Sequence, residues 1–332
     1  MNEQTLYKLK YSTRIVFTIG LLVWVFHIVD IQKSAQMTKT ARWEYIGILF
    51  LMVNLLFLLQ GLKGRYIFAK QGCDVSVGRL YCLSALVSLY GLILPGILST
   101  GIKWYILKKD TGKGGNVLSA MAYNQLSIMV VMVAFGCAAF IADNPVTRLT
   151  EDAKVVWICS AAAGLILAVL LGLFLLLVNR SMGQKAVGAV MRTIKFLPEN
   201  VVRKIDKVLH QIAQFQTAGY RFHFTVLVLT IIINLGGAVA IYFISAKASN
   251  IVVPLGTLIW ISGVLYILGR LPISIGNLGV REVALVGLLP LYGVDKSSAL
   301  LMSITVFCGL LFRALIGAIC QLVLTFRTRR VK

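Results

Sequence analysis

The run VVWICSAAAGLILAVLLGLFLLLV, residues 155–178, contains no charged residue. As a helix rising roughly 1.5 Å per residue, it is long enough to cross about 30 Å of hydrocarbon. The block Phe222–Ile244 has the same apolar character, and similar blocks recur along the whole chain. The sequence therefore predicts an all-α polytopic membrane protein in which residues 1–332 form a single integral membrane domain.

The composition supports this class and excludes others. Apolar residues make up 58% of the chain and charged residues 14%, whereas soluble proteins carry roughly 25% charged residues. The net charge is +21, but the basic residues lie mostly in loops between apolar spans, where they orient the chain and meet anionic headgroups. No interleaving of basic and aromatic residues predicts a base-stacking surface. Membrane lipids with anionic headgroups, and no nucleic acid, are the expected partners.

Six apolar segments are expected to cross the membrane completely. The first is expected to be a retained helix, because it runs into Gln32 and Lys33 rather than into a small-residue cleavage site. Two further apolar regions, Leu80–Leu107 and Val252–Tyr292, are interrupted by proline, glycine and polar residues. The six predicted spans are Ile15–Ile31, Tyr45–Leu62, Leu118–Ile141, Val155–Val178, Phe222–Ile244 and Leu300–Phe326.

The distribution of Lys and Arg predicts the orientation of the chain. These residues concentrate at both termini and in segments 63–79, 103–113 and 180–221, whereas segment 142–154 is net acidic. By the positive-inside rule the N- and C-termini are cytoplasmic. Because segments 63–79 and 103–113 are both basic, the region between them is expected to enter from the cytoplasm, turn at Pro95 and leave on the same side.

The second broken region echoes the first. Leu-Pro followed by Gly-aliphatic-cation occurs in residues 94–103 and again in residues 271–281. Each half of the chain, residues 1–150 and 151–332, then contains two spans, a hairpin and a third span in that order. The second half starts on the opposite side of the membrane. We therefore predict an inverted repeat whose two re-entrant or broken hairpins meet near the midplane. The alternative is two ordinary kinked helices and a chance echo.

A long cytoplasmic segment, residues 182–218, has the pattern of an amphipathic helix. Pro198-Glu199 is typical of a helix start. Apolar residues then recur on one face with basic residues on the flanks, which predicts a helix lying on an anionic membrane surface. The alternative is a connector packed on the cytoplasmic end of the bundle.

The strongest candidates for chemistry lie in the second broken region. Arg281 can grip a phosphate through two N–H groups, and Glu282 can orient that cation or exchange a proton. Gly276 and Gly279 permit tight turns whose backbone N–H groups can face an anion. Ionisable residues inside a membrane are costly, which favours a function. In the alternative interpretation Arg281 and Glu282 only neutralise partners on neighbouring helices.

Other polar residues in the apolar regions extend this predicted site. Lys103 is the corresponding cation of the first hairpin, or else a snorkelling loop lysine. Arg313 lies mid-span with no acid three or four residues away, and Glu282 is the predicted partner across the bundle. Intramembrane amides serve as often to join helices as to bind ligands. The remaining candidate substrate-binding residues are Arg270, Ser274, Asn277, Ser99 and Asn124.

No catalytic or cofactor motif stands out. The chain lacks a phosphate-binding glycine loop, a nucleophile elbow and a histidine cluster, and its six cysteines lack metal-ligand spacing. Paired-carboxylate catalysis would need a second acid near Glu282, and the apolar spans supply none. We expect a protein that is not an enzyme and that has no cofactor and no metal.

The stretch LPISIGNLGVREVALVGLL, residues 271–289, resembles a family signature. It is similar to the transmembrane, flippase-like region of bacterial lysylphosphatidylglycerol synthase, which also occurs as stand-alone proteins. The resemblance extends to Leu94–Lys109 and covers nearly the whole chain. It implies a bacterial inner-membrane protein that moves a lipid, with aminoacylated or otherwise modified lipids as the best-known cargo. The aminoacyl-transferase domain of the complete synthase is not in this sequence.

Three functions follow as hypotheses. The leading one is a translocase that receives the phosphate headgroup of a glycero- or polyprenyl-lipid in a polar cavity, with Glu282 as a pairing or proton-coupling residue. One alternative is an integral-membrane transferase of a lipid-modification or glycosylation pathway, which predicts an acidic or metal-binding cluster at one membrane face. The other is an accessory protein beside a lipid-modifying enzyme.

Overall fold

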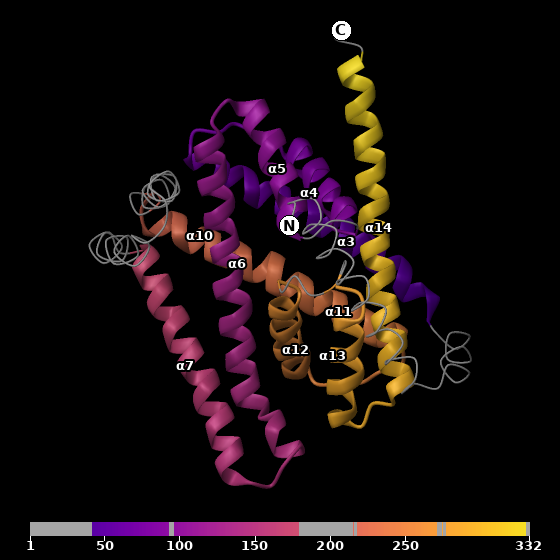
Figure 1. The fold of residues 1–332 in the computed structure, drawn as a ribbon. Coiled ribbons are helices and arrows are strands. Elements are labelled where there is room, and N and C mark those ends of the chain that lie inside the picture. Colours follow the sequence, from indigo (N-terminus) through magenta and orange to yellow (C-terminus); the bar gives the residue numbers. More distant parts are fainter. Residues whose placement is uncertain are drawn as a thin grey trace, which may run out of the picture.

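The computed structural model describes residues 42–92, 96–178, 215, 218–270, 274 and 277–329. Within these ranges the chain is helical and contains no strand, and the helices pack into one bundle (Figure 1). The described helices are α3 (Trp43–Lys70), α4 (Val77–Gly91), α5 (Gly96–Thr111), α6 (Gly114–Asp143), η1 (Pro145–Arg148), α7 (Ala153–Val178), α10 (Tyr220–Thr230), the π-helical turn η3 (Ile231–Gly236), α11 (Gly237–Ala248), α12 (Leu255–Leu268), α13 (Val280–Leu288), η4 (Leu289–Tyr292) and α14 (Lys296–Arg329).

Five of the described helices are long and apolar enough to cross a membrane. They match five of the six predicted spans, and α10, η3 and α11 together make one continuous span, Tyr220–Ala248. The sixth prediction, Ile15–Ile31, lies outside the described residues. The polytopic all-α membrane fold is therefore confirmed. The helices run further than predicted at several ends, most clearly at Lys70, where α3 continues into the segment that the sequence assigned to a basic loop.

Local sequence sets several of these helix ends. Ser76 caps α4, because its side chain accepts a hydrogen bond from the Arg79 N–H at 3.3 Å. Asn144 ends α6 in the left-handed conformation, with a φ of 45°, which Asn tolerates better than most residues. Pro254 lies directly before α12. A residue at this position donates no backbone hydrogen bond within the helix, so the missing N–H of proline costs nothing there.

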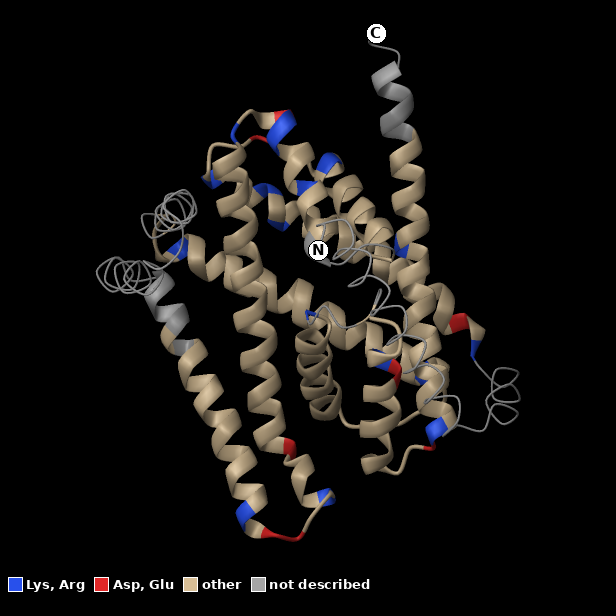
Figure 2. Ribbon diagram, viewed as in Figure 1, with Lys and Arg blue, Asp and Glu red and all other residues tan. Residues whose placement is uncertain are grey.

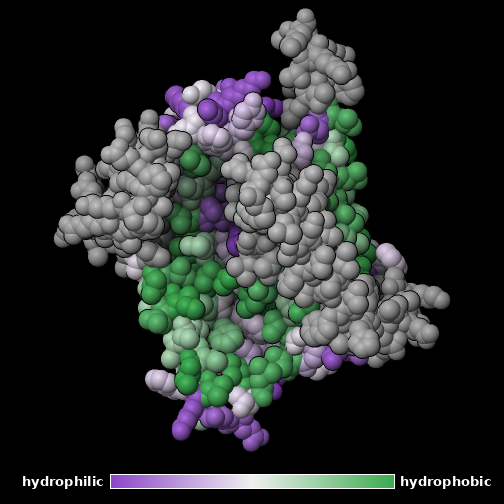
Figure 3. Space-filling view, in the orientation of Figure 1, coloured by the Kyte–Doolittle hydropathy of each residue, from purple (hydrophilic) through white to green (hydrophobic). Residues whose placement is uncertain are grey.

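The outer surface is apolar over the height of the bundle. Large side chains point outward from the spans, among them Leu51 (73% exposed), Trp157 (73%) and Leu165 (67%). In the span Ala153–Leu170 of α7, only 11% of the residues are buried. Figure 3 shows hydrophobic surface over the middle of the molecule and hydrophilic surface at both ends. This pattern fits a bundle that faces lipid, with α7 at its edge.

Both broken regions form pairs of short helices. The arms α4, α5, α12 and α13 have 15, 16, 14 and 9 residues, so each is at most about 24 Å long, less than the roughly 30 Å of a hydrocarbon core. Figure 1 shows the α4–α5 pair towards one end of the molecule and the α12–α13 pair towards the other. Short paired arms favour the predicted hairpins over single kinked helices.

The two halves of the chain interlock through their hairpins. The first arm α4 packs against α14, and the first arm α12 packs against α6. Glycines make both contacts: a Cβ added to Gly317 would lie 2.3 Å from the carbonyl oxygen of Ala85, and one added to Gly263 would lie 2.9 Å from the Cα of Gly136. Small residues allow such close helix approach in membranes. The hairpin of each half thus packs on a long helix of the other half. This symmetry supports the predicted inverted relation between residues 1–150 and 151–332, which stays a prediction.

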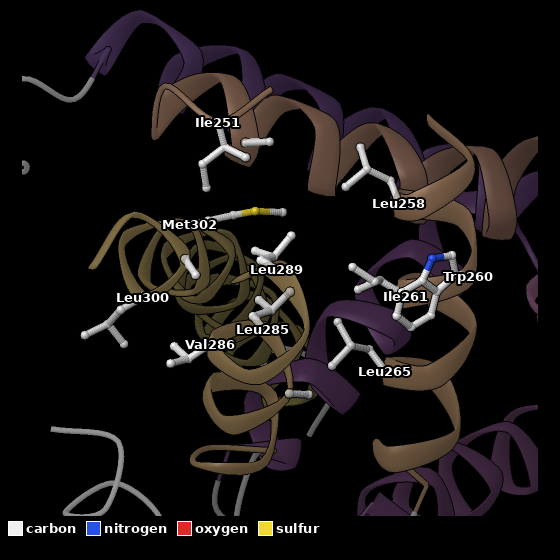
Figure 4. Packing of buried hydrophobic residues seen from close by; sticks show 13 residues of the cluster. Ile251, Leu258, Trp260, Ile261, Leu265, Leu285, Val286, Leu289, Leu300 and Met302 are labelled. Atoms are coloured by element: carbon white, nitrogen blue, oxygen red, sulfur yellow. The ribbon is translucent and has the colours of Figure 1, made fainter. Parts of the chain in front are cut away.

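The second hairpin is held by a large buried apolar cluster, which joins α12, α13 and α14 (Figure 4). Leu258, Ile261, Leu285, Leu289 and Met302 are fully buried in it. Between membrane helices such contacts stabilise through close van der Waals packing, because leaving lipid gains little hydrophobic free energy. The cluster fixes α13, and with it the residues at its N-terminus, against α14.

Most of the predicted amphipathic segment 182–218 lies outside the described residues. Its described residue Phe215 is 1% exposed and stacks on Tyr123 of α6, with 4.3 Å between ring centroids. Phe215 also packs against Phe222 of α10. At this point the segment packs on the bundle, as the connector alternative predicts.

Candidate functional site

Glu282 starts α13. Gly279, the residue before the helix, has a φ of 81°, a left-handed conformation that favours glycine. The Glu282 carboxylate accepts a hydrogen bond from the Gly279 N–H, with 2.7 Å between Oε2 and N. An acid in this third helical position satisfies a backbone donor and interacts favourably with the helix dipole. Part of the role of Glu282 is therefore local and structural.

Arg281 closes a buried polar network with Glu282. Its Nη2 lies 2.5 Å from Glu282 Oε1, and its Nε donates to Ser303 Oγ at 3.1 Å. Ser303 in turn donates to Glu282 Oε1 at 2.9 Å. Arg281 and Glu282 are 6% and 5% exposed, and the guanidinium also lies over the ring of Phe307. Because these groups satisfy one another, the network joins α13 to α14 as a neutral unit.

The predicted partnership between Glu282 and Arg313 is wrong. Glu282 is occupied by Arg281, its neighbour in sequence, and within the described residues no carboxylate lies within ion-pair distance of Arg313. Arg313 instead lies over the ring of Phe57, 5.3 Å from the centroid. The hydroxyl of Tyr242 on α11 interacts electrostatically with Arg281, Arg313 and Glu282, which places these groups in one region of the interior.

Arg270 lies two residues after the end of α12, at the tip of the second hairpin, and is exposed. Its guanidinium lies over the ring of Tyr266, 4.8 Å from the centroid. With the amide oxygen of Gln125 turned towards them, that oxygen accepts from Arg270 Nη2 at 2.9 Å and from the Tyr266 hydroxyl at 2.8 Å. Gln125, on α6, was not among the predicted site residues, although it directly follows Asn124.

Two predicted polar residues have unsatisfied atoms. The amide oxygen of Asn124 and the hydroxyl of Ser274 are buried and have no hydrogen-bond partner among the described residues. Ser274 belongs to the stretch between α12 and α13, and Asn124 adjoins the residue that holds Arg270. Buried polar atoms without partners are uncommon. The Ser274 hydroxyl therefore leaves hydrogen-bonding capacity in the connection between α12 and α13.

Asn277 shapes the turn before α13. Its φ is 61°, so Asn277 and Gly279 are both left-handed within three residues. Its side-chain amide packs so closely on Gly269 that an added Cβ there would lie 2.6 Å from Nδ2. Asn277 therefore joins the two ends of the connection between α12 and α13.

In the first hairpin, Lys103 is a helical residue and not a loop lysine. It lies on α5, half-buried, and its Nζ donates to Ser84 Oγ on α4 at 3.1 Å. The bond ties the two arms of the hairpin together. Ser99, four residues earlier on α5, is buried at 2% exposure.

Lys63 was missed by sequence analysis. It was assigned to the basic loop 63–79, but α3 continues to Lys70 and buries Lys63 to 2% exposure. Its Nζ donates to Asn234 Oδ1 at 2.7 Å and to Thr230 Oγ1 at 3.3 Å. The apolar residues Tyr66, Ile67 and Phe68, which follow Lys63, were the signal that the helix continues.

Charged residues outside this interior gather at the two ends of the molecule (Figure 2). At one end Arg79 pairs with Asp110 at 2.8 Å. At the other, Asp143 accepts hydrogen bonds from Thr257, Trp260 and Tyr292. In the part of the chain that the structure describes, no group of three His, Cys, Asp or Glu side chains could hold a metal ion.

Comparison with known proteins gives one match. The family model of the lysylphosphatidylglycerol synthase TM region matches residues 12–317. No curated protein and no solved structure shows a significant match to the chain. The match covers both hairpins and agrees with the resemblance that residues 271–289 carry.

Proposed function

The chain belongs to the lysylphosphatidylglycerol synthase transmembrane family, and from this premise we propose that it binds and translocates a phosphate-containing membrane lipid. The family relates the chain to the modification or flipping of membrane lipids. The observation that carries the specific proposal is Arg270, an exposed guanidinium at the tip of a hairpin too short to cross the membrane.

The surroundings of Arg270 suit phosphate. A guanidinium can offer two parallel N–H groups to phosphate oxygens, and stacking on an aromatic ring keeps it oriented. Tyr266 and Gln125 supply that orientation through neutral groups and leave the positive charge uncancelled. The unsatisfied hydroxyl of Ser274 adds hydrogen-bonding capacity in the connection that follows Arg270. Figure 3 shows hydrophilic surface in a recess at mid-height, with hydrophobic surface to its left and below it.

The hairpins support movement of the lipid. A headgroup crossing the bilayer needs polar partners at the depth where lipid tails offer none. The short arm α12 brings Arg270 to that depth, and the long helix α14 carries Arg313 in the middle of its span, while the acyl or isoprenoid tails stay in the surrounding bilayer. The buried network of Arg281, Glu282 and Ser303 holds α13 on α14, and Glu282 is its one carboxylate.

The orientation and location are part of this proposal. The end of the molecule formed by the connections next to α4 and α5 carries Arg79, Lys108, Lys109 and Lys113. By the positive-inside rule this end faces the cytoplasm. We place the protein in the bacterial inner membrane with both termini in the cytoplasm.

The experiment uses the purified chain in liposomes that contain phosphatidylglycerol with a fluorescent headgroup label. Dithionite added outside quenches about half of the label when lipids do not cross. We expect the wild-type chain to expose most of the label, and Arg270→Gln to slow this at least tenfold. Lys154→Gln, an exposed position at the far end of α7, is the matched control and should behave as wild type.

Quenching by wild-type liposomes equal to that of empty liposomes refutes translocation. Equal rates for wild type and Arg270→Gln refute the role of the hairpin tip. The alternative, an accessory or transferase component of a lipid-modification pathway, predicts modification of a lipid together with a partner enzyme and no crossing by the chain alone.

A further inference from the structure

The helices α6 and α12 touch through their backbones at one pair of glycines. A Cβ added to Gly263 would lie 2.9 Å from the Cα of Gly136 and 3.1 Å from the carbonyl oxygen of Met132. A Cβ added to Gly136 would lie 3.0 Å from the Cα of Gly263. Small residues permit such close approach between membrane helices. Because neither glycine has a side chain that locks the crossing angle, we call this contact the pivot.

Polar side chains tie the two helices together on one side of the pivot. Asp143, the last residue of α6, accepts hydrogen bonds from Thr257 Oγ1 at 3.1 Å and from Trp260 Nε1 at 2.8 Å, both on α12. The hydroxyl of Tyr292 on η4 donates to the same carboxylate oxygen. We call these four residues the Asp143 latch.

A second tie lies on the other side of the pivot. Gln125 of α6 contacts Tyr266 of α12, with 2.8 Å between the amide and the hydroxyl. With the amide oxygen turned towards Arg270, that oxygen accepts from Arg270 Nη2 at 2.9 Å. We call these three residues the Arg270 latch. On both helices the pivot glycine lies between the residues of the two latches.

This arrangement makes α12 a lever. Thr257 and Arg270 are six and seven residues from Gly263, which is about 9–10 Å along a helix. A tilt of roughly 10° moves either end by about 1.6 Å, enough to take a hydrogen bond beyond bonding distance. Because α12 is one continuous helix, swinging one end away from α6 presses the other end onto it. Opening both ends at once would also separate the two glycines.

We propose that the second hairpin opens from α6 at one latch at a time about this pivot, and that a lipid phosphate bound by Arg270 opens the Arg270 latch. The proposal rests on the proposed function and adds the regulation of that site. The resting partner of the guanidinium, Gln125, is neutral, and hydrogen bonds to a charged phosphate oxygen are roughly twice as strong as neutral ones. The phosphate therefore draws Arg270 away from Gln125.

Two further features make the opening one-sided. Tyr266 stacks on the Arg270 guanidinium and lies on the same helix, so the two side chains move together. The Asp143 latch has a carboxylate at its centre, which repels a phosphate. A bound headgroup therefore opens the end of α12 that holds Arg270 and leaves the Asp143 end closed.

The test is hydrogen–deuterium exchange of the full chain in detergent, followed by mass spectrometry of two peptides of the second hairpin. The first peptide, residues 255–262, reports the Asp143 latch, and the second, residues 264–270, reports the Arg270 latch. An end that opens admits water to its amides, so dioctanoyl phosphatidylglycerol should speed exchange of the second peptide about threefold or more and leave the first unchanged. Inorganic phosphate at the same concentration should change neither.

Latch variants test the pivot without lipid. Gln125→Met should speed exchange of the second peptide alone. Asp143→Asn, whose neutral amide is a weaker acceptor, should speed exchange of the first peptide alone. Glu151→Gln, which neutralises an exposed acid in the connection after α6, is the matched control and should exchange as wild type. Unchanged exchange of α3 shows that each variant is folded.

The outcomes separate the two proposals. Folded latch variants that speed both peptides equally, or neither, overturn the pivot whatever the lipid does. A wild-type chain that does not respond to the lipid, with both latch variants as expected, overturns phosphate binding at Arg270 and with it the proposed function. An equal response to inorganic phosphate overturns the lipid ligand. Where one latch variant does not fold, the other variant and the response of the wild-type chain decide.

Discussion

The contact between α4 and α14 makes a quantitative prediction at Gly317. An alanine there would place its Cβ 2.3 Å from the carbonyl oxygen of Ala85, which is backbone and cannot rotate away. Ordinary C···O contacts are about 3.3–3.6 Å, so the two helices would have to part by about 1 Å. Overpacking of this kind typically costs about 1–3 kcal/mol. Ala85 is 0% exposed, so the displacement would disturb packing on all sides.

The matched control is Gly164→Ala on α7, where an added Cβ meets nothing within 4 Å. Both changes replace a helical glycine by alanine, so the roughly 1 kcal/mol gained in helix propensity is common to them. The difference between the variants therefore isolates the contact. Equilibrium unfolding by SDS in mixed micelles, followed by circular dichroism, should show Gly317→Ala less stable than Gly164→Ala by about 1–3 kcal/mol. Equal unfolding midpoints would refute the close approach of α4 and α14.

Three further predictions concern polar groups. Glu282→Gln should lower the free energy of unfolding by about 3–5 kcal/mol, because it leaves the buried Arg281 guanidinium without its carboxylate; the same unfolding assay checks this, and a loss below 1 kcal/mol would contradict it. Asp143→Leu should lower the free energy of unfolding by at least about 2 kcal/mol, because three hydrogen-bond donors lose their shared carboxylate acceptor. The same unfolding assay checks this, and a variant as stable as the wild type would contradict it. Cys73, outside the spans, should react slowly with maleimide at pH 8, because burial raises the pKa of its thiol and lowers the reactive thiolate fraction; the rate should rise with pH and on unfolding, and reaction as fast as that of a free thiol would disprove this.

The sequence predicts the spans well because lipid imposes a strong constraint on them. Every backbone group at membrane depth must be paired within the chain, so an uncharged run such as residues 155–178 has to be a helix. The helix ends are different, because a cation near an end can lie in a loop, snorkel or point inward. Lys63 looks like a loop lysine by composition alone. Its burial depends on Thr230 and Asn234, which lie more than 160 positions later in the chain.

The sequence points to several residues of the candidate site but not to their pairings. Arg281 and Glu282 stand out because charge is rare in apolar segments. Their mutual ion pair and the contribution of Ser303 depend on how α13 meets α14. Ser303 is one more serine in an apolar helix, and nothing in its sequence neighbourhood distinguishes it. For the same reason the sequence analysis predicted Glu282 as the partner of Arg313, whereas Glu282 pairs with Arg281.

The arrangement of polar contacts across the two halves limits how the halves can move against each other. The network of Arg281, Glu282 and Ser303 lies wholly within the second half, and the glycine contacts between halves involve no hydrogen-bonded side chains. A rocking of one half against the other can leave both intact. The bond from Lys63 to Asn234 is different, because α3 belongs to the first half and η3 to the second.

Lys63→Met would therefore remove a polar tie between the halves, because its side chain has no N–H donor for Asn234. We expect this substitution to speed amide hydrogen exchange in η3, which the π-helical turn already makes less regular. The exchange of α13, held by the Arg281 network, should stay unchanged. Equal effects on both segments would mean that the substitution loosens the whole bundle and that Lys63 does not tie η3 in particular.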